Sequence, residues 1–274
     1  MPDKTNWRQA LYLSKLRALC GASPIGEDED DRSSDWVYWV SCKKGSSALV
    51  VGIGGGNLLF RMHGMGIKVY AVDKSQRNIT HAEIRAEARG ASDIRFGGFT
   101  DQGEIPFLER RFDTVVLREY DLPYGDFQSF ESVCKLAHKI LEKDGHAVFF
   151  VENALSPMNL FRNSLKSGLP RKSLMEYGHC LRSAGFRSVE HFAPLPTGFG
   201  VPLFMVPLHK NALIFFFTTL FTLFSTASTE VKKKYGWRYK AAIMASAVMQ
   251  LLQCTWLFRF FCPEYMLIAR KIDP

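Results

Sequence analysis

Short apolar runs and amphipathic stretches alternate through the middle of the chain. Continuous apolar runs bounded by turn residues predict buried strands, because parallel strands covered on both faces carry such runs. The amphipathic stretches between them, of which 78–90 and 127–145 end on a glycine, predict helices. This alternation predicts an α/β fold with a doubly wound, mostly parallel sheet. The predicted strands lie within 47–56, 67–73, 112–119, 146–152, 187–193 and 263–271.

The pattern changes after residue 200. Two uncharged, strongly apolar stretches, 212–228 and 241–258, flank the sequence TEVKKKYGWRYK. They predict an apolar helical hairpin with a basic, aromatic turn, inserted before the last strand. The segment that precedes the hairpin, 192–208, contains four prolines. We expect it to be an extended loop that forms one wall of an acceptor pocket.

The N-terminal part differs from the strands and helices that follow it. A helix is expected over 5–19, and the acidic, turn-forming stretch 21–35 is typical of a linker. The apolar residues between 36 and 40 are expected to lie against the following domain. The chain therefore divides into an N-terminal helix and acidic linker (1–45), a ligand-binding core (46–200), the apolar hairpin with its basic turn (201–262) and the last core strand (263–274).

Charge is distributed unevenly along the 274 residues. The chain has 35 Lys and Arg against 27 Asp and Glu, a net charge of +8, and nine basic against three acidic residues after position 200 place +6 of it there. Basic residues among apolar stretches favour contact with an anionic membrane surface, through 212–258, over a phosphate-binding groove. The acidic run at 27–31 also argues against nucleic acid as a partner.

The cysteines and the N-terminal residues predict the compartment. The six cysteines are scattered without a CxxC pair, which argues against a zinc site or a disulfide framework. The first residues are charged and lack the apolar core of a secretory signal. We therefore expect a cytoplasmic protein. Its membrane association is expected to be peripheral or monotopic, because two membrane-spanning helices would place the basic turn outside, against the positive-inside rule. The alternative is a soluble helical subdomain that covers the active site or dimerises.

A glycine-rich turn carries the strongest chemical signal. Gly52, Gly54 and Gly56 form a GxGxG between a predicted strand and a predicted helix, and Asp73 ends the next strand. Glycines let the backbone turn tightly against a ligand, and an acidic side chain at that place can accept both hydroxyls of a ribose. The pattern predicts a nucleotide cradle, and a tightly packed structural loop is the alternative. A nicotinamide motif fits less well, because its third glycine would fall on Asn57.

Four segments together resemble one enzyme family. In this order, ALVVGIGGGN, VYAVDKS, NITHAEIRAEARG and DIRFGGFTDQGEIPFLERRFDTVVLRE are similar to the class I S-adenosylmethionine-dependent methyltransferases with small-molecule acceptors, of the type 11 and 12 kind. The resemblance implies a Rossmann-like sheet of seven strands, S-adenosylmethionine as the cofactor and no metal. The glycines would line the methionine end of the cofactor, Asp73 the ribose and Asp101 the adenine. The cofactor-binding residues that it implies are Gly52, Gly54, Gly56, Asp73, Lys74, Asp101, Gln102 and Glu119.

One position departs from the family pattern. The family usually has Asp or Glu two residues before the first glycine, where it holds the loop or the amino group of the cofactor, and here that position is Val50. Either another group takes over this task or the cofactor is bound more weakly.

Three side chains are candidates for the catalytic base. Methyl transfer is an in-line displacement on a sulfonium, so the protein must align the acceptor and, for a hydroxyl, remove a proton. Glu119 and Glu152 close strands at the edge where α/β sheets bind ligands, and His179 follows in a predicted helix. A structural ion pair is the alternative for Glu119, and surface packing is the alternative for His179. The pair Glu152 and Asn153 resembles the magnesium site of catechol-type methyltransferases, but an ordinary turn of metal-free members fits better.

These observations predict an S-adenosylmethionine-dependent methyltransferase. We expect O-methylation of a lipophilic or lipid-linked small molecule at the membrane surface, and the class of acceptor rests on the hairpin alone. The alternative is a membrane-attached module that binds S-adenosylmethionine or a partner without turnover. Nucleic-acid methylation is the least favoured reading, because the sequence has no Asn-Pro-Pro-Tyr type signature.

Overall fold

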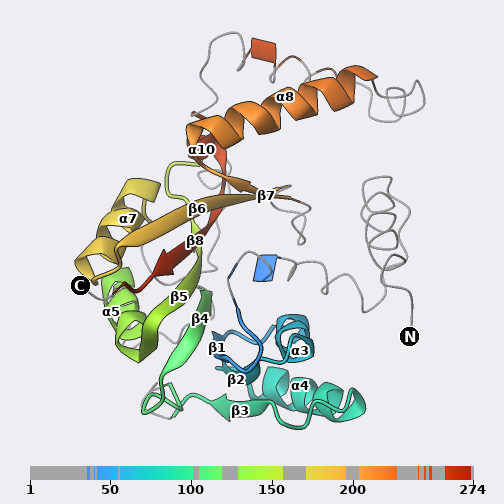
Figure 1. Cartoon of the computed structure of the whole chain (residues 1–274), viewed down its shortest axis with the longest axis vertical. Coiled ribbons are helices and arrows are strands. Elements are labelled where there is room, and N and C mark those ends of the chain that lie inside the picture. The colour runs from blue at the N-terminus through green and yellow to red at the C-terminus, as the bar shows by residue number, and fades with distance from the viewer. Residues whose placement is uncertain are drawn as a thin grey trace.

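One sheet of eight strands organises the protein (Figure 1). The strand order is β3-β2-β1-β4-β5-β8-β6-β7, in which the first five strands pair in parallel and the last three pairings are antiparallel. The elements are β1 (Ser47–Val51), α3 (Asn57–Gly64), β2 (Lys68–Asp73), α4 (Gln76–Ala88), β3 (Arg95–Gly98), β4 (Phe112–Arg118), α5 (Phe130–Ile140), β5 (Leu141–Glu152), α7 (Leu174–Ser183), β6 (Ser188–Leu195), β7 (Phe204–Pro207), α8 (Lys210–Thr226), α10 (Phe258–Phe261) and β8 (Glu264–Arg270). The computed structural model describes residues 36–37, 40, 42–54, 56–100, 105–118, 129–156, 171–195, 204–226, 240, 244, 247–248 and 257–272.

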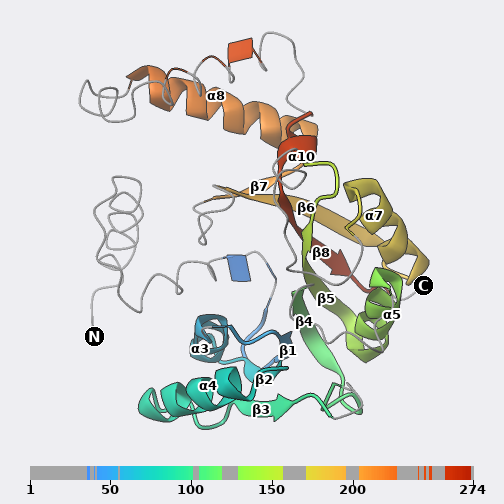
Figure 2. The same cartoon turned by 180° about the vertical axis from the view of Figure 1, so that it is seen from behind.

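Helices cover both faces of the sheet, as Figures 1 and 2 show from opposite sides. Successive side chains of a strand point to opposite faces, so a strand buried on both sides is apolar throughout. In β1, Leu49 and Val51 belong to the apolar core beneath α5 and α7, whereas Ala48 and Val50 belong to the core beneath α3 and α4. The mostly parallel, doubly wound Rossmann-like fold expected from the apolar runs is therefore confirmed.

The expected number of seven strands is wrong by one. The segment 192–208, expected to be an extended loop, contains β7, which pairs with β6 from Phe192 opposite Pro207 to Leu195 opposite Phe204. β7 is the edge strand of the sheet. An edge strand tolerates proline because only one of its sides must supply ladder hydrogen bonds. Pro207, the last residue of β7, is therefore compatible with this eighth strand.

The helix expected over 127–145 ends earlier than predicted. After α5 the chain turns extended at Leu141, which is buried and pairs with Phe112 at the start of β4. Gly145 does not cap a helix. A Cβ atom at Gly145 would lie 2.9 and 3.0 Å from two backbone carbonyl oxygens. Close approach of the backbone, and not helix termination, requires this glycine.

The first apolar stretch of the expected hairpin forms α8, which lies next to β7 and α10 (Figure 1). Leu213 and Phe217 are buried with Val206 of β7, and the rings of Phe217 and Phe258 meet edge to face at 5.1 Å. Phe215, by contrast, is 74% exposed. The second apolar stretch, 241–258, lies mostly outside the described residues. Within the part of the chain that the structure describes, no helix is both long enough and apolar enough to cross a bilayer.

The residues just before the sheet pack against it. Trp36 and Val37 form a short 3-10 turn and are buried with Val40 in the core beneath α3 and α4. The Trp36 ring meets Phe150 of β5 edge to face at 5.1 Å. This agrees with the expectation that the apolar residues between 36 and 40 lie against the domain. The helix expected over 5–19 and the acidic linker lie outside the described residues.

Candidate cofactor and active site

The glycine turn joins the carboxyl end of β1 to the first residue of α3. Gly52, Gly54 and Gly56 have φ angles of 95°, 53° and 84°, in the left-handed region where side chains are strained. The N–H of Gly52 donates to the carbonyl of Val72 in β2 at 2.8 Å, which holds the turn against the neighbouring strand. No side chain caps α3 at Gly56. An uncapped helix start leaves backbone N–H groups for an anionic or polar ligand.

A buried carboxylate holds this turn in place. Asp73, at the end of β2, is only 3% exposed. Its Oδ2 accepts from the N–H of Ile53 and its Oδ1 from the N–H of Ser75, each at 2.8 Å. The side-chain Nδ2 of Asn78 donates to both oxygens at 3.2 Å. The residue expected to receive the ribose therefore also fixes the position of the glycine turn.

The missing family carboxylate at position 50 has a structural explanation. Val50 is 1% exposed and packs in the apolar core beneath α3 and α4. An ionised side chain would be desolvated there at considerable cost. Asp73 instead supplies a carboxylate to the turn, through the N–H of Ile53. Of the two tasks expected of an acid at residue 50, holding the loop is thus performed from the neighbouring strand.

A second polar contact fixes the start of α3 on α4. The Oδ1 of Asn57 accepts from Nη2 of Arg85 at 2.6 Å, and Asn57 is 3% exposed. The guanidinium groups of Arg85 and Arg89 lie 5.3 and 4.7 Å from the centre of the Phe60 ring. These contacts fix the direction of α3 and with it the position of the turn.

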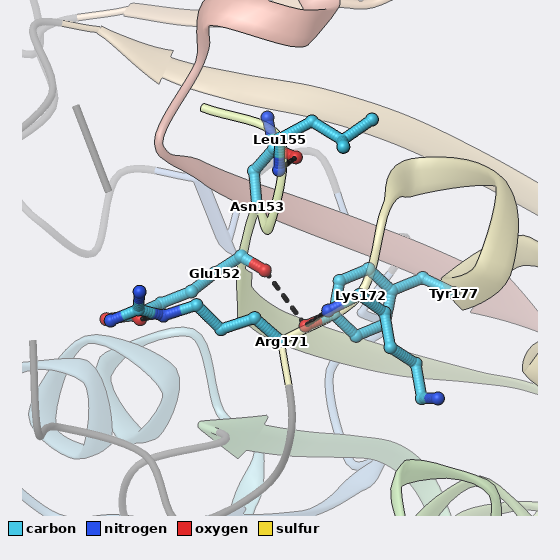
Figure 3. A network of polar contacts seen from close by, with 6 residues as sticks. All are labelled: Glu152, Asn153, Leu155, Arg171, Lys172 and Tyr177. Carbon is cyan, nitrogen blue, oxygen red and sulfur yellow. Dashed lines mark hydrogen bonds and ion pairs between the residues drawn. The ribbon is translucent and has the colours of Figure 1, made fainter. Parts of the chain in front are cut away.

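Polar side chains also gather at the carboxyl end of β5 (Figure 3). Oε2 of Glu152 accepts from Nε of Arg171 at 2.6 Å, and Glu152 is 8% exposed. The hydroxyl of Tyr177, from α7, donates to the carbonyl of Glu152 at 2.9 Å and accepts from the N–H of Lys172 at 3.3 Å. The strand end, the segment before α7 and α7 itself are therefore joined by one hydrogen-bond network. A charged pair lies where a doubly wound sheet binds its ligands.

With this geometry established, comparison with known proteins identifies the domain. Residues 48–145 match the family model described as "Methyltransferase domain". This part of the chain is a methyltransferase domain. No curated protein matches the chain in sequence.

Solved structures share the methyltransferase fold at low sequence identity. An S-adenosylmethionine-dependent methyltransferase from Thermotoga maritima has a TM-score of 0.50 at 13% identity, over 98% of this chain and 96% of that one. Phosphoethanolamine N-methyltransferase 2 from Haemonchus contortus has a TM-score of 0.53 at 16% identity, over 92% of this chain and 54% of that one. The [4+2]-cyclase SpnF has a TM-score of 0.50 at 17% identity, over 89% of this chain and 81% of that one. At these identities the likeness establishes the fold alone.

Asn153, directly after β5, has a structural role. Its Nδ2 donates to the carbonyls of Phe260 and Cys262 at 3.1 and 2.7 Å, and its Oδ1 accepts from the N–H of Leu155 at 2.9 Å. The side chain thereby joins the end of β5 to the turn that leads into β8. Burial raises the pKa of the Cys262 thiol to about 12, so this cysteine stays protonated. Among the described residues, no group of three or more His, Cys, Asp or Glu could hold a metal ion.

The remaining predicted site residues of the methyltransferase occupy different places. Lys74 is exposed directly after β2. His179 is exposed in the middle of α7, whose buried face comprises Tyr177, Gly178 and Leu181. Asp101, Gln102 and Glu119 lie outside the described residues, and their roles stay predictions.

Two residues that contact the candidate site residues were not identified from the sequence. Asn78 lies five residues after Asp73, on the first turn of α4, and this spacing is the only signal that could have indicated it. Arg171 lies 19 residues after Glu152, too far for any local pattern to pair them.

Proposed function

We propose that this methyltransferase transfers the methyl group to an oxygen atom of a lipophilic or lipid-linked small molecule at a membrane surface. The cofactor supplies an electrophilic methyl group on a sulfonium, and the chain must hold it in line with the acceptor. The observation that carries the proposal is the glycine turn beside the uncapped start of α3, which suits the polar methionine end of S-adenosylmethionine, with the Asp73 carboxylate at the end of β2 as the proposed ribose acceptor.

Residues that follow different strands are proposed to bind different parts of the cofactor. Gly52, Gly54 and Gly56 would line the methionine end and Asp73 the ribose, with Lys74 beside it. Asp101 and Gln102 would meet the adenine, and Glu119 would close β4 facing the acceptor. For comparison, the Haemonchus contortus enzyme is described in complex with S-adenosylhomocysteine.

Glu119, Glu152 and His179 stay the candidates for removing the acceptor proton. The Glu152 carboxylate pairs with Arg171, so an acceptor hydroxyl would have to reach it beside the guanidinium. Glu119 follows β4, the strand between β1 and β5, and would face the acceptor from the centre of the sheet. We therefore place Glu119 first, with Glu152 holding Arg171 at the rim of the acceptor site.

The lipophilic acceptor and the membrane surface rest on α8 and the basic turn that follows it. Ile214 and Phe215 are 41% and 74% exposed, while Leu213 and Phe217 on the same helix are buried. α8 therefore presents apolar residues outward as well as toward the protein. A helix of this kind can sink its outer face into the headgroup region of a membrane. The five basic residues within 232–240 would meet anionic lipid, and each is worth about 1 kcal/mol near such a surface.

Sedimentation with vesicles tests the membrane proposal. The protein should bind vesicles containing phosphatidylserine at low salt and dissociate at high salt. Replacing Lys232, Lys233 and Lys234 with Gln should weaken binding by at most about 3 kcal/mol. A control with the same change in charge replaces Lys43, Lys44 and Lys139, which are exposed elsewhere. If the parent protein stays in the supernatant at low salt, the hairpin is a cover or a dimer contact.

Labelled cofactor tests the reaction itself. Incubation of the protein with methyl-labelled S-adenosylmethionine and either cell membranes or soluble extract should transfer label to the lipid-extractable fraction, in a base-resistant ether or a base-labile ester. Label confined to water-soluble products would contradict the lipophilic acceptor and leave the methyltransferase activity standing.

A second candidate function is cofactor binding without methyl transfer. Two observations favour it: Val50 replaces the usual acidic residue, and the fold is shared with the [4+2]-cyclase SpnF. This alternative predicts tight binding of S-adenosylmethionine and no labelled product in any fraction.

A further inference from the structure

The side chain of Asn78 occupies both oxygens of the proposed ribose acceptor. Its Nδ2 lies 3.2 Å from Oδ1 and 3.2 Å from Oδ2 of Asp73. Both oxygens of the Asp73 carboxylate thus accept from the same side-chain amide. Two vicinal ribose hydroxyls, each donating to one oxygen, would occupy the same pair of acceptors.

The hydrogen-bonding capacity of Asp73 is already used. An ionised carboxylate has about four lone-pair positions. The N–H groups of Ile53 and Ser75 occupy one on each oxygen, and the amide of Asn78 approaches both. With Asp73 only 3% exposed, a ribose cannot reach the carboxylate in this arrangement.

Of these donors, only Asn78 can leave without disturbing the backbone. Ile53 belongs to the glycine turn and Ser75 caps α4, so moving either N–H would rearrange an element of the site. Asn78 is half-buried, and its own N–H is held separately by Oγ of Ser75 at 3.4 Å. Rotation of the Asn78 side chain therefore leaves the start of α4 intact.

We propose that Asn78 competes with the cofactor ribose for Asp73 and thereby sets the affinity and the ligand preference of the site. The inference rests on the proposed role of Asp73 as the ribose acceptor. A ligand with both ribose hydroxyls can donate to the same two oxygens as the Asn78 side chain and can therefore displace it. A ligand without these hydroxyls gains nothing from displacing Asn78, so the residue favours intact nucleosides.

The test compares Asn78→Ala with the parent protein. The dissociation constant of S-adenosylhomocysteine, measured by calorimetry, should fall about three- to tenfold in Asn78→Ala, the scale of one net hydrogen bond. Asn78→Ser should act in the same direction. Thr80→Ala, an exposed change on the same helix, should leave the constant unchanged. Adenosine should gain affinity in Asn78→Ala, whereas 2′,3′-dideoxyadenosine should not.

The outcomes separate this inference from the proposed function. Unchanged or weaker binding of S-adenosylhomocysteine by Asn78→Ala, with binding by the parent protein intact, would overturn the competition alone; weaker binding would show that Asn78 positions Asp73. An equal gain for adenosine and its dideoxy analogue would also overturn it. Failure of both proteins to bind S-adenosylhomocysteine would overturn the competition and the cofactor site together. Thermal melts of the ligand-free variants show that the compared proteins are folded.

Discussion

Asp73→Asn changes one atom and should destabilise the ligand-free protein. Each carboxylate oxygen accepts from a backbone N–H, Oδ1 from Ser75 and Oδ2 from Ile53. An asparagine amide has one oxygen and one NH2 group, so in either orientation the NH2 must face one of these two N–H groups. Because Asp73 is 3% exposed, water can hardly take over the lost contact.

The size of the effect follows from these contacts. One buried donor left without an acceptor costs about 1–3 kcal/mol, and the remaining hydrogen bonds lose the advantage of a charged acceptor, about 1 kcal/mol. The sum is about 2–4 kcal/mol, less than the stability of a typical domain. The variant should therefore fold, with a lower urea midpoint, and should bind S-adenosylhomocysteine at least about tenfold more weakly.

A matched control lies at the other end of β1. Oδ2 of Asp113 accepts from the N–H and the hydroxyl of Ser47 at 2.8 and 3.1 Å, but Asp113 is exposed and these bonds use one oxygen only. Asp113→Asn can present its single oxygen to Ser47 and should cost less than about 0.5 kcal/mol. If Asp73→Asn proves as stable as Asp113→Asn in urea titrations, Asp73 does not hold the glycine turn.

Three further predictions concern the core, a histidine and the proposed base. Val50→Asp should lower the melting temperature without tightening the binding of S-adenosylhomocysteine, because a carboxylate there enters an apolar core; tighter binding in calorimetry would refute this. Burial and two neighbouring arginines lower the pKa of His191 below its ordinary 6.5, so the unfolded chain binds the proton more readily. Stability in urea should therefore decrease as the pH is lowered from about 7 to about 5.5, and less steeply in His191→Gln; an unchanged slope would contradict the shift. His179→Gln should leave methyl transfer within about twofold and Glu119→Gln should reduce it about a hundredfold, as measured with labelled cofactor; the reverse order would place the base on α7.

The sequence indicates the sheet and the cofactor turn well, because both depend on local patterns. Apolar runs predict β1, β2 and β4 since these strands are buried on both faces, and the positive φ angles at Gly52, Gly54 and Gly56 explain why the motif contains glycine. The contact of Asp73 with Ile53 depends on the packing of two strands, which no local pattern contains, and only the five-residue spacing could have indicated Asn78.

The errors have similar causes. The edge strand β7 was missed because prolines at its ends resemble those of a loop, although an edge strand tolerates them. The end of α5 was placed too late because Gly145 resembles a helix cap, although its real constraint is the close approach of two carbonyl oxygens, one from Glu142 and one from Asp113 in β4. The pairing of Glu152 with Arg171 spans 19 residues and only the fold brings the two together.

The position of β8 has a consequence for how the sheet forms during synthesis. Among the described strands β8 comes last in sequence, yet it lies between β5 and β6 and pairs with both. Until residues 264–270 emerge from the ribosome, β5 and β6 each keep an open edge, and open edges are sites of aberrant association. The sheet therefore closes at its centre only once β8 is present, and deletion of residues 264–270 would leave one open edge on β5 and another on β6.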